Sequence, residues 1–220
     1  MNLESSKNLG GIGAILMFIG LIAGVQPFLG IIALVGLILV LVALHGFADY
    51  YKESGIFNNS IYGLVTGIVG VVIAGVVLVY LFFYTSILTN FLHKIFPGWN
   101  GNWSTLSGLT PTTSNLKASD FLPVLGSALL ILVILWIFAI IAAFFVRRSL
   151  KTLSAKASVG LFSTAGQLLF IGAFLTIILI GFLLMWIAVL LAAIAFFQIK
   201  PQQEQPAATM APPPPTPTQV

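Results

Sequence analysis

Three side chains of metal-binding type, His45, Asp49 and Glu53, follow one another at intervals of four residues. A helix through this segment would place all three on one face, where they could bind a divalent metal ion. The competing interpretation is that they are solvated residues at a helix end, with Asp49 and Glu53 paired to Arg147 or Arg148. We prefer the second interpretation, so the sequence predicts no metal or cofactor site.

Other catalytic chemistry lacks the residues that it needs. The chain contains no cysteine, and its two histidines, His45 and His93, fall on opposite sides of the membrane in the arrangement derived below. The sequence has no H-E-x-x-H motif, and a serine nucleophile would need a base beside it. We therefore expect no catalytic residues and no enzymatic activity.

The composition is that of an integral membrane protein. Of the 220 residues, 59% are hydrophobic and 6% are charged, against roughly 45–50% and about 25% in a soluble domain. A chain with so few polar residues cannot cover a water-exposed surface. The nine Lys and Arg residues lie mostly beside apolar runs, so they indicate orientation in a membrane and not nucleic-acid binding.

The apolar stretches are long enough for six membrane-spanning helices, because one crossing needs about 20 apolar residues. Residues 9–47 hold two crossings that separate at Gln26-Pro27, since proline cannot continue a helix. The run 159–199 also needs a break, which we place between Thr176 and Gly181. The predicted helices cover about residues 9–25, 28–47, 61–84, 121–146, 159–175 and 179–199.

These helices form an all-α membrane domain over residues 1–200, with two helical hairpins flanking a central helix pair. The hairpins share a short similarity, L-M-F-I-G at 16–20 and L-L-F-I-G at 168–172. An internal duplication and a chance likeness of two apolar hairpins both explain it, and the sequence leaves the choice open.

The segments outside the predicted helices differ in character. Residues 85–96 alternate at helical spacing between apolar and polar side chains, which is typical of an amphipathic extension at a membrane surface. Residues 97–119 are predicted to be a loop, in which Asn102-Trp103-Ser104 makes Asn102 a candidate for N-glycosylation. Residues 201–220 are rich in proline and are predicted to be disordered.

Basic residues fall mainly on one side of the predicted membrane. Positive residues close to helix ends mark the cytoplasmic side. With six crossings, Lys94 and Lys117 lie on one side, and the other side carries Lys7, Lys52, Arg147, Arg148, Lys151, Lys156 and Lys200. We expect a multi-pass protein of the cell membrane with both termini in the cytoplasm and residues 97–119 outside.

Arg147, Arg148, Lys151 and Lys156 form the main basic cluster. The cluster either docks on anionic lipid headgroups, where each base contributes about 1 kcal/mol, or is a plain topology anchor. The two roles overlap, and we favour the anchor.

Gly63, Gly67, Gly70 and Ala74 form a face of small residues, which permits close helix contact in lipid. Packing inside the protein is the preferred explanation, and an interface with another subunit is the alternative. Gln167 is the most polar side chain well away from the predicted helix ends, and we expect it to hydrogen bond to a neighbouring helix.

Six short segments stand out by their order along the chain. They are residues 9–13 (LGGIG), 36–40 (GLILV), 48–51 (ADYY), 56–59 (IFNN), 147–151 (RRSLK) and 160–166 (GLFSTAG). In this order the chain resembles a largely archaeal family of integral membrane proteins, domain of unknown function 996. The resemblance implies a polytopic membrane protein and an archaeal origin, and it brings no activity, cofactor or catalytic residues.

Two functional hypotheses follow. The first is a non-enzymatic accessory or structural subunit, which contacts membrane lipids and either other membrane subunits or further copies of itself. The second is a channel or carrier for a small neutral or hydrophobic solute, which predicts a cavity near Gln167 and Trp136. A tightly packed interior would exclude the second hypothesis.

Overall fold

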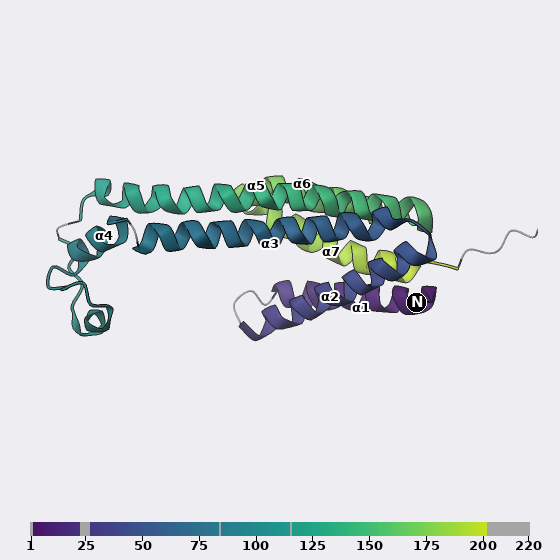
Figure 1. Ribbon diagram of the computed structural model, residues 1–220, viewed down its shortest axis with the longest axis horizontal. Helices are drawn as coiled ribbons and strands as arrows, with labels where there is room; N and C mark the ends of the chain where they lie inside the picture. The colour runs from purple at the N-terminus through teal and green to yellow at the C-terminus, as the bar shows by residue number, and fades with distance from the viewer. Residues whose placement is uncertain (1, 23–26, 84, 115, 202–220) are drawn as a thin grey trace, which may run out of the picture.

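The computed structural model describes residues 2–22, 27–83, 85–114 and 116–201, and every regular element in these ranges is helical (Figure 1). The predicted turn residue Gln26 and tail residues 202–220 lie outside the described residues. The elements are α1 (Leu3–Ile22), α2 (Pro27–Tyr50), α3 (Ser54–Phe83), α4 (Ile87–Ile95), the 3₁₀ turn η1 (Trp103–Gly108), α5 (Ala118–Ala157), α6 (Gly160–Leu175), the 3₁₀ turn η2 (Thr176–Ile178) and α7 (Ile180–Gln198).

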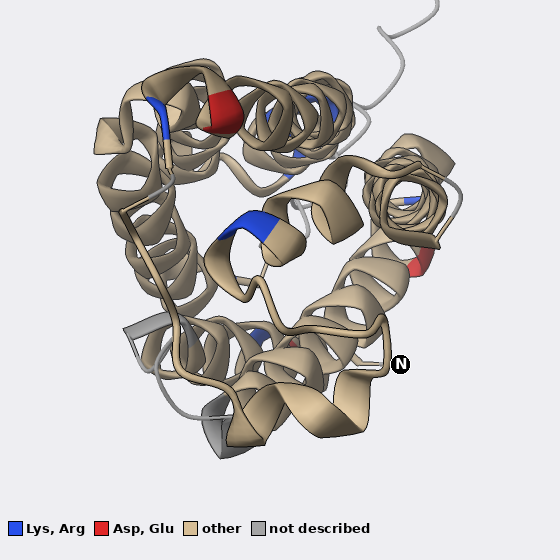
Figure 2. Cartoon of the chain, turned by 90° about the vertical axis from the view of Figure 1, so that its left-hand side faces the viewer, with Lys and Arg blue, Asp and Glu red and all other residues tan. Residues whose placement is uncertain are grey.

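The six long helices are arranged in a ring. Around the ring, α2 packs on α1, α1 on α7, α7 on α6, α6 on α5, α5 on α3, and α3 on α2. Figure 2 looks along the long axis of the molecule and shows these helices surrounding a central region, with few charged residues on them. The ring is closed by the contact between α1 and α7, which brings the two predicted hairpins together.

The helices of the ring differ in length. The central pair, α3 and α5, has 30 and 40 residues, whereas α6 and α7 have 16 and 19. Figure 1 shows that α3 and α5 continue well past the ends of the hairpins α1–α2 and α6–α7. We call the end of the molecule where α1 begins and α7 ends the basic end, and the opposite end, which carries α4 and η1, the far end.

Helices α1, α2, α3 and α5 extend beyond their predicted bounds at the basic end, and α3 and α5 do so by the most residues. Helix α3 begins at Ser54, before the predicted start at residue 61, and α5 continues past the predicted end at Val146 to Ala157. The added turns of α5 alternate between buried Leu150 and Leu153 and exposed Lys151. A helix with one buried face and one charged face is stable outside lipid, which apolar length alone does not predict.

The basic end holds a packed apolar core. Phe47, Phe162 and Phe196 are at most 1% exposed, and Phe162 meets Phe196 edge-on with ring centroids 4.9 Å apart. Ile56 and Leu153 complete this core from α3 and α5. The core closes the ring at this end.

The turns of the basic end use non-glycine residues in the left-handed region. Lys52, between α2 and α3, has φ 51°, and Ser158, between α5 and α6, has φ 56°. The Ser154 hydroxyl donates to the carbonyl oxygen of Val159 at 2.9 Å. These hydrogen-bonded turns return the chain directly, so that α3 and α6 start beside the helices that precede them.

The far end is a small folded segment and not a continuation of α3. The predicted amphipathic extension at 85–96 is a separate helix, α4, whose Phe91 packs edge-on against Phe121 of α5 at 5.3 Å. Trp99 is 3% exposed, and its indole nitrogen donates to the carbonyl oxygen of Asn102 at 2.8 Å. Lys94 forms an ion pair with Asp120, which ties α4 to the start of α5.

Within the described ranges, five helices are long and apolar enough to cross a membrane: α2 from Gly30, α3, α5, α6 with η2, and α7. Within its described residues, α1 does not meet that requirement, and it carries Glu4 and Lys7 in its first turns. The chain is thus an all-α, multi-pass membrane protein with five candidate crossings by length and composition, against the six predicted.

Candidate functional site

Two adjoining apolar cavities lie between the helices of the ring, and each is partly open to the outside, because the first is lined by exposed Val72 and the second by exposed Phe182. The first has a volume of about 570 Å³ and is lined by residues of α1, α2, α3, α5 and α6, including Met17, Leu41 and Leu169. The second has about 560 Å³ and lies between α3, α5, η2 and α7. Gly67 and Val71 of α3 line both cavities. Each volume falls within the range of small-molecule sites, about 300–1,000 Å³.

The small-residue face of α3 packs mainly against α5. A Cβ on Gly63 would lie 2.8 Å from the Val146 Cγ2 atom, and one on Gly70 would overlap Phe138. Ala74 is 5% exposed. These three positions pack inside the protein. Gly67 differs, because a Cβ there would meet nothing within 4 Å.

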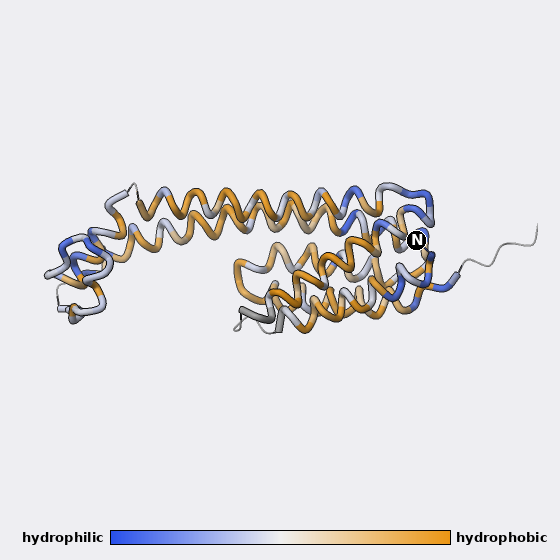
Figure 3. Tube along the Cα trace, turned by 60° about the horizontal axis from the view of Figure 1, so that its bottom comes forward, coloured by the Kyte–Doolittle hydropathy of each residue, from blue (hydrophilic) through white to orange (hydrophobic). Residues whose placement is uncertain are grey.

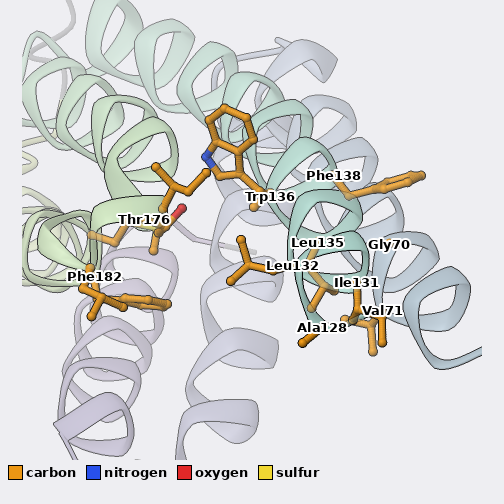
Figure 4. Close-up of a pocket in the computed structure, with 15 residues that line it drawn as sticks. Gly70, Val71, Ala128, Ile131, Leu132, Leu135, Trp136, Phe138, Thr176 and Phe182 are labelled. Atoms are coloured by element: carbon orange, nitrogen blue, oxygen red, sulfur yellow. The ribbon is translucent and has the colours of Figure 1, made fainter. Parts of the chain in front are cut away.

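The polar groups that line the second cavity are already engaged. Trp136 projects from α5 toward the turn that contains Thr176 (Figure 4), and its indole nitrogen donates to the carbonyl oxygens of Ala173 and Phe174, both at 3.1 Å. The Thr176 hydroxyl donates to the Ala173 carbonyl oxygen at 2.7 Å. These carbonyls belong to the last turn of α6, which has no partners within its own helix. The cavity therefore presents an apolar surface to any occupant.

A buried hydroxyl pair lies at the basic end of the first cavity. The Ser60 hydroxyl donates to the Ser149 oxygen at 2.8 Å, and the Ser149 hydroxyl donates to the carbonyl oxygen of Ile56. Both serines are at most 4% exposed. This network links α3 to α5 and leaves no free donor for a ligand, because each hydroxyl proton is already in a hydrogen bond.

The two hairpins pack in the same way at the residues that the sequence similarity aligns. A Cβ on Gly20 would lie 2.6 Å from the Ala33 Cβ, and one on the aligned Gly172 would lie 2.9 Å from the Gly181 carbonyl oxygen. Each glycine thus stands at the close approach of the two arms of its own hairpin. The shared packing role matches the internal similarity of 16–20 and 168–172.

The basic cluster occupies the last turns of α5. The Arg147 guanidinium lies 5.1 Å from the centre of the Phe170 ring, and that of Arg148 lies 5.7 Å from the Phe144 ring. Lys151 and Lys156 are exposed. All four side chains lie where apolar helix gives way to the polar end, a position that suits both roles considered for them.

The predicted pairing of acidic residues with the arginines is wrong. Glu53 contacts Lys156 at 3.1 Å, and Asp49 contacts His45 at 3.6 Å. Helix α2 ends at Tyr50, and the turn at Lys52 redirects the chain, so Glu53 leaves the face of His45 and lies beside the end of α5. Among the described residues no group of three metal-binding side chains converges.

The structure also places Gln167 and Asn102, two further positions that the sequence singled out. Gln167 is exposed and makes no hydrogen bond within the described ranges, because α6 turns Phe162, Ala165 and Gly166 inward instead. The expected interhelical hydrogen bond is therefore absent there, and Gln167 does not line either cavity. Asn102 is exposed at the far end, and its side-chain oxygen accepts hydrogen bonds from the Ser104 backbone and hydroxyl groups.

The sequence identified Trp136 as a cavity residue but missed Thr176, Ser60 and Ser149 as functional positions. Thr176 carried a signal, because it is the polar residue nearest the predicted break in an otherwise apolar run. The serine pair carried none, because 89 residues separate its members. Burial of the Tyr51 hydroxyl was also unpredicted, and this burial, with a smaller contribution from Tyr50, raises the Tyr51 pKa above its usual value.

The comparisons with known proteins agree with the sequence resemblance. The uncharacterized protein MJ1644 of Methanocaldococcus jannaschii is 26% identical over 200 residues, covering 90% of this chain and 94% of its own length. No solved structure matches. The family model described as "Protein of unknown function (DUF996)" matches residues 32–190. Since the match covers most of the helix ring, the chain belongs to the DUF996 family of proteins of unknown function.

Proposed function

We propose that the protein binds a hydrophobic molecule inside its helix ring. The observation that carries this proposal is the pair of adjoining cavities that share Gly67 and Val71. Their lining is almost wholly apolar, and the polar groups of Trp136, Thr176 and Ser60 are hydrogen bonded within the protein. A hydrocarbon chain or another apolar solute fits such a site, because no buried polar group would be left unpaired.

The arrangement supports binding or carriage more than conduction. The core of Phe47, Ile56 and Leu153 lies at the basic end of the ring and closes it. An open channel needs a continuous path past this core. A carrier would need the core to move, whereas a binding protein would not.

The test uses substitution at the one open position of the small-residue face. Gly67→Leu places a side chain in both cavities, and Gly75→Leu is the matched control, since a Cβ at either position meets nothing within 4 Å. Gly75 is exposed and does not line the cavities. Protein purified in mild detergent is extracted, and the bound apolar molecules are quantified by mass spectrometry.

We expect at least a fivefold loss of bound molecule in Gly67→Leu and no loss in Gly75→Leu. Equal amounts in both variants would contradict the proposal, because lipid held on the outer surface would not respond to a filled interior.

A second candidate function is that of an accessory subunit. Its support is the far-end segment, where Trp103 is 50% exposed and lies edge-on to buried Trp99 at 5.2 Å. An exposed aromatic beside a rigid one is a common anchor for a protein partner. Purification from native membrane would test this role: a stoichiometric partner that is lost in Trp103→Ala supports it, and a lone monomer counts against it.

The orientation is part of the proposal. We propose that the basic end faces the cytoplasm, because Lys7, Lys52 and the α5 cluster gather there, whereas Lys94 and Lys117 lie at the far end. With this orientation, Asn102 and its sequon face outward, where glycosylation takes place.

A further inference from the structure

Along each helix, the depth at which large apolar side chains become exposed marks the boundary of the lipid. On α3, α5 and α6, exposed large apolar residues start at Tyr62, Phe144 and Ile171. Nearer the basic end, the described residues of these helices bury or half-bury their large apolar side chains. Apolar side chains that face outward require lipid, whereas an inward core suits water. On α3, α5 and α6 the bilayer surface at the basic end therefore lies near these three residues, whereas on α7 exposed apolar side chains continue to Phe197, closer to the basic end.

The opposite surface is fixed by α3 and α5. Helix α3 ends at Phe83, which is 72% exposed, and the far-end charges begin at Asp120, two residues before exposed Leu122. The distance from Tyr62 to Phe83 along α3 is about 32 Å, and that from Leu122 to Phe144 along α5 is about 33 Å. Both match a hydrocarbon core of about 30 Å. Figure 3 shows α3 and α5 hydrophobic between two polar ends.

The turn between α6 and α7 lies near the middle of this layer. The Trp136 indole nitrogen binds the Ala173 and Phe174 carbonyl oxygens, so the end of α6 is level with Trp136. Along α5, Trp136 is about 12 Å from Phe144 and about 21 Å from Leu122. A helix pair that crossed the membrane would turn near Leu122, and this pair turns far short of it.

The α1–α2 hairpin is equally short. The first exposed large apolar residue of α1 is Ile12, and the helix ends at Ile22, which leaves about 15 Å of lipid-facing helix. The Trp186 indole nitrogen donates to the Phe18 carbonyl oxygen at 3.1 Å, which holds this hairpin level with α7. Both hairpins thus end at a similar depth, as Figure 1 shows.

A placement of the bilayer with the hairpin tips at its surface conflicts with the charges. A core of about 30 Å that started at Trp136 would reach Lys156. Arg147, Arg148 and Lys151 would then lie within hydrocarbon, which is strongly unfavourable for charged groups. The same placement would leave exposed Leu122 and its apolar neighbours in water.

We propose that the chain crosses the bilayer twice, through α3 and α5, and that both hairpins enter from the basic side and turn back near mid-depth. Lipid chains of the opposite leaflet then fill the recess between the hairpin tips and the α4–η1 segment. The tip suits this occupant, because Ile178, Leu179 and Ile180 are each more than half exposed and uncharged. Its helix-end carbonyls are satisfied by Trp136 and Thr176, as backbone in hydrocarbon requires.

The hairpin tip adjoins the second cavity, which Leu179 also lines, and the absence of cysteine makes the placement of the tip directly testable. Single variants Ile178→Cys, Leu125→Cys, Ala155→Cys and Ser107→Cys of the full chain are spin-labelled and reconstituted in vesicles of phosphatidylcholine and phosphatidylglycerol. The accessibility of each label to oxygen, which concentrates in mid-bilayer, is compared with its accessibility to a water-soluble nickel chelate. Leu183→Cys, also exposed, replaces Ile178→Cys if that variant does not assemble.

We expect the oxygen-to-nickel ratio at Ile178 to exceed those at Ala155 and Ser107 at least fivefold, with Leu125 clearly above these two. An interfacial ratio at Ile178 together with a water-like ratio at Leu125 would overturn the proposal in favour of hairpins that cross fully. An immobile label at Ile178 that neither reagent reaches would overturn the lipid as occupant, because a second protein chain would then cover the tip.

Discussion

The ring of Trp186 stacks on the ring of Phe18 with centroids 4.4 Å apart and planes 10° from parallel, and the same indole donates to the Phe18 carbonyl oxygen. One side chain of α7 thus contacts both the side chain and the backbone of α1. A matching arrangement holds Trp136 against the end of α6. In each case a tryptophan satisfies a backbone carbonyl near the tip of a hairpin, where water is absent in the proposed placement.

Replacement of either tryptophan by phenylalanine should destabilise the helix ring. Trp136→Phe keeps an aromatic ring but removes the donor to the Ala173 and Phe174 carbonyls. We expect a loss of about 1–3 kcal/mol in the free energy of unfolding, the usual cost of a buried unsatisfied polar group. Thermal unfolding in detergent measures it, and Trp103→Phe at an exposed site is the control; equal stability of all variants would contradict the role.

Alanine substitutions along α3 should separate packed from open glycines. A Cβ on Gly70 would overlap Phe138, whereas one on Gly67 meets nothing within 4 Å. We expect Gly70→Ala to cost about 1–3 kcal/mol through overpacking and Gly67→Ala to be neutral or slightly stabilising. Chemical denaturation of the purified protein measures the free energy of unfolding of both variants. A greater loss for Gly67→Ala than for Gly70→Ala would contradict the packing of α3 on α5.

The serine pair should behave as a unit. Ser149→Ala leaves the buried Ser60 hydroxyl without its acceptor, so we expect a loss of about 1–3 kcal/mol. The double variant Ser60→Ala with Ser149→Ala removes both groups and should recover much of that loss. Additive losses in the two single variants and the double variant would mean that the serines do not interact.

Tyr51→Phe should maintain or increase stability. In the described part of the chain the Tyr51 hydroxyl is buried without a hydrogen-bond partner, so its removal should gain about 1 kcal/mol. Burial raises the pKa of Tyr51 in the folded state, so the unfolded chain ionises first and stability falls as the pH rises above about 10. Unfolding from pH 8 to 11 should therefore be less pH-dependent in Tyr51→Phe, with exposed Tyr62→Phe as control. A less stable Tyr51→Phe would contradict the burial.

The orientation can be checked in intact cells. With the basic end in the cytoplasm, a membrane-impermeant maleimide should label Ser107→Cys from outside and should label Ala155→Cys only after permeabilisation. Both positions are exposed. Labelling of Ala155→Cys in intact cells would reverse the orientation.

The sequence predicts the helical class and the membrane environment well, because both depend on local composition. The aligned glycines Gly20 and Gly172 were recognisable for the same reason, since each lies in a short repeated pattern. Trp136 was named as a cavity residue together with Gln167, and only Trp136 lines a cavity.

The part of each helix that is covered by lipid was not predictable from the sequence. Helix α7 is apolar from Ile180 to Phe197, yet Phe196 and Ala195 are buried in the basic-end core and do not face lipid. Apolar length alone does not distinguish a side chain covered by protein from one covered by lipid, so it does not fix the number of crossings. The contact between Ser60 and Ser149 was equally hidden, because it depends on the register of two helices far apart in the chain.

The ring closes through α1 and α7, and the hydrogen bond between Trp186 and Phe18 joins residues 168 positions apart. During synthesis the α1–α2 hairpin is therefore made long before α7. The surface of α1 that contacts α7 is uncovered until almost the whole polypeptide has left the ribosome. Until that last seam forms, lipid chains can reach the inner surface of α1 from the side that α7 later covers.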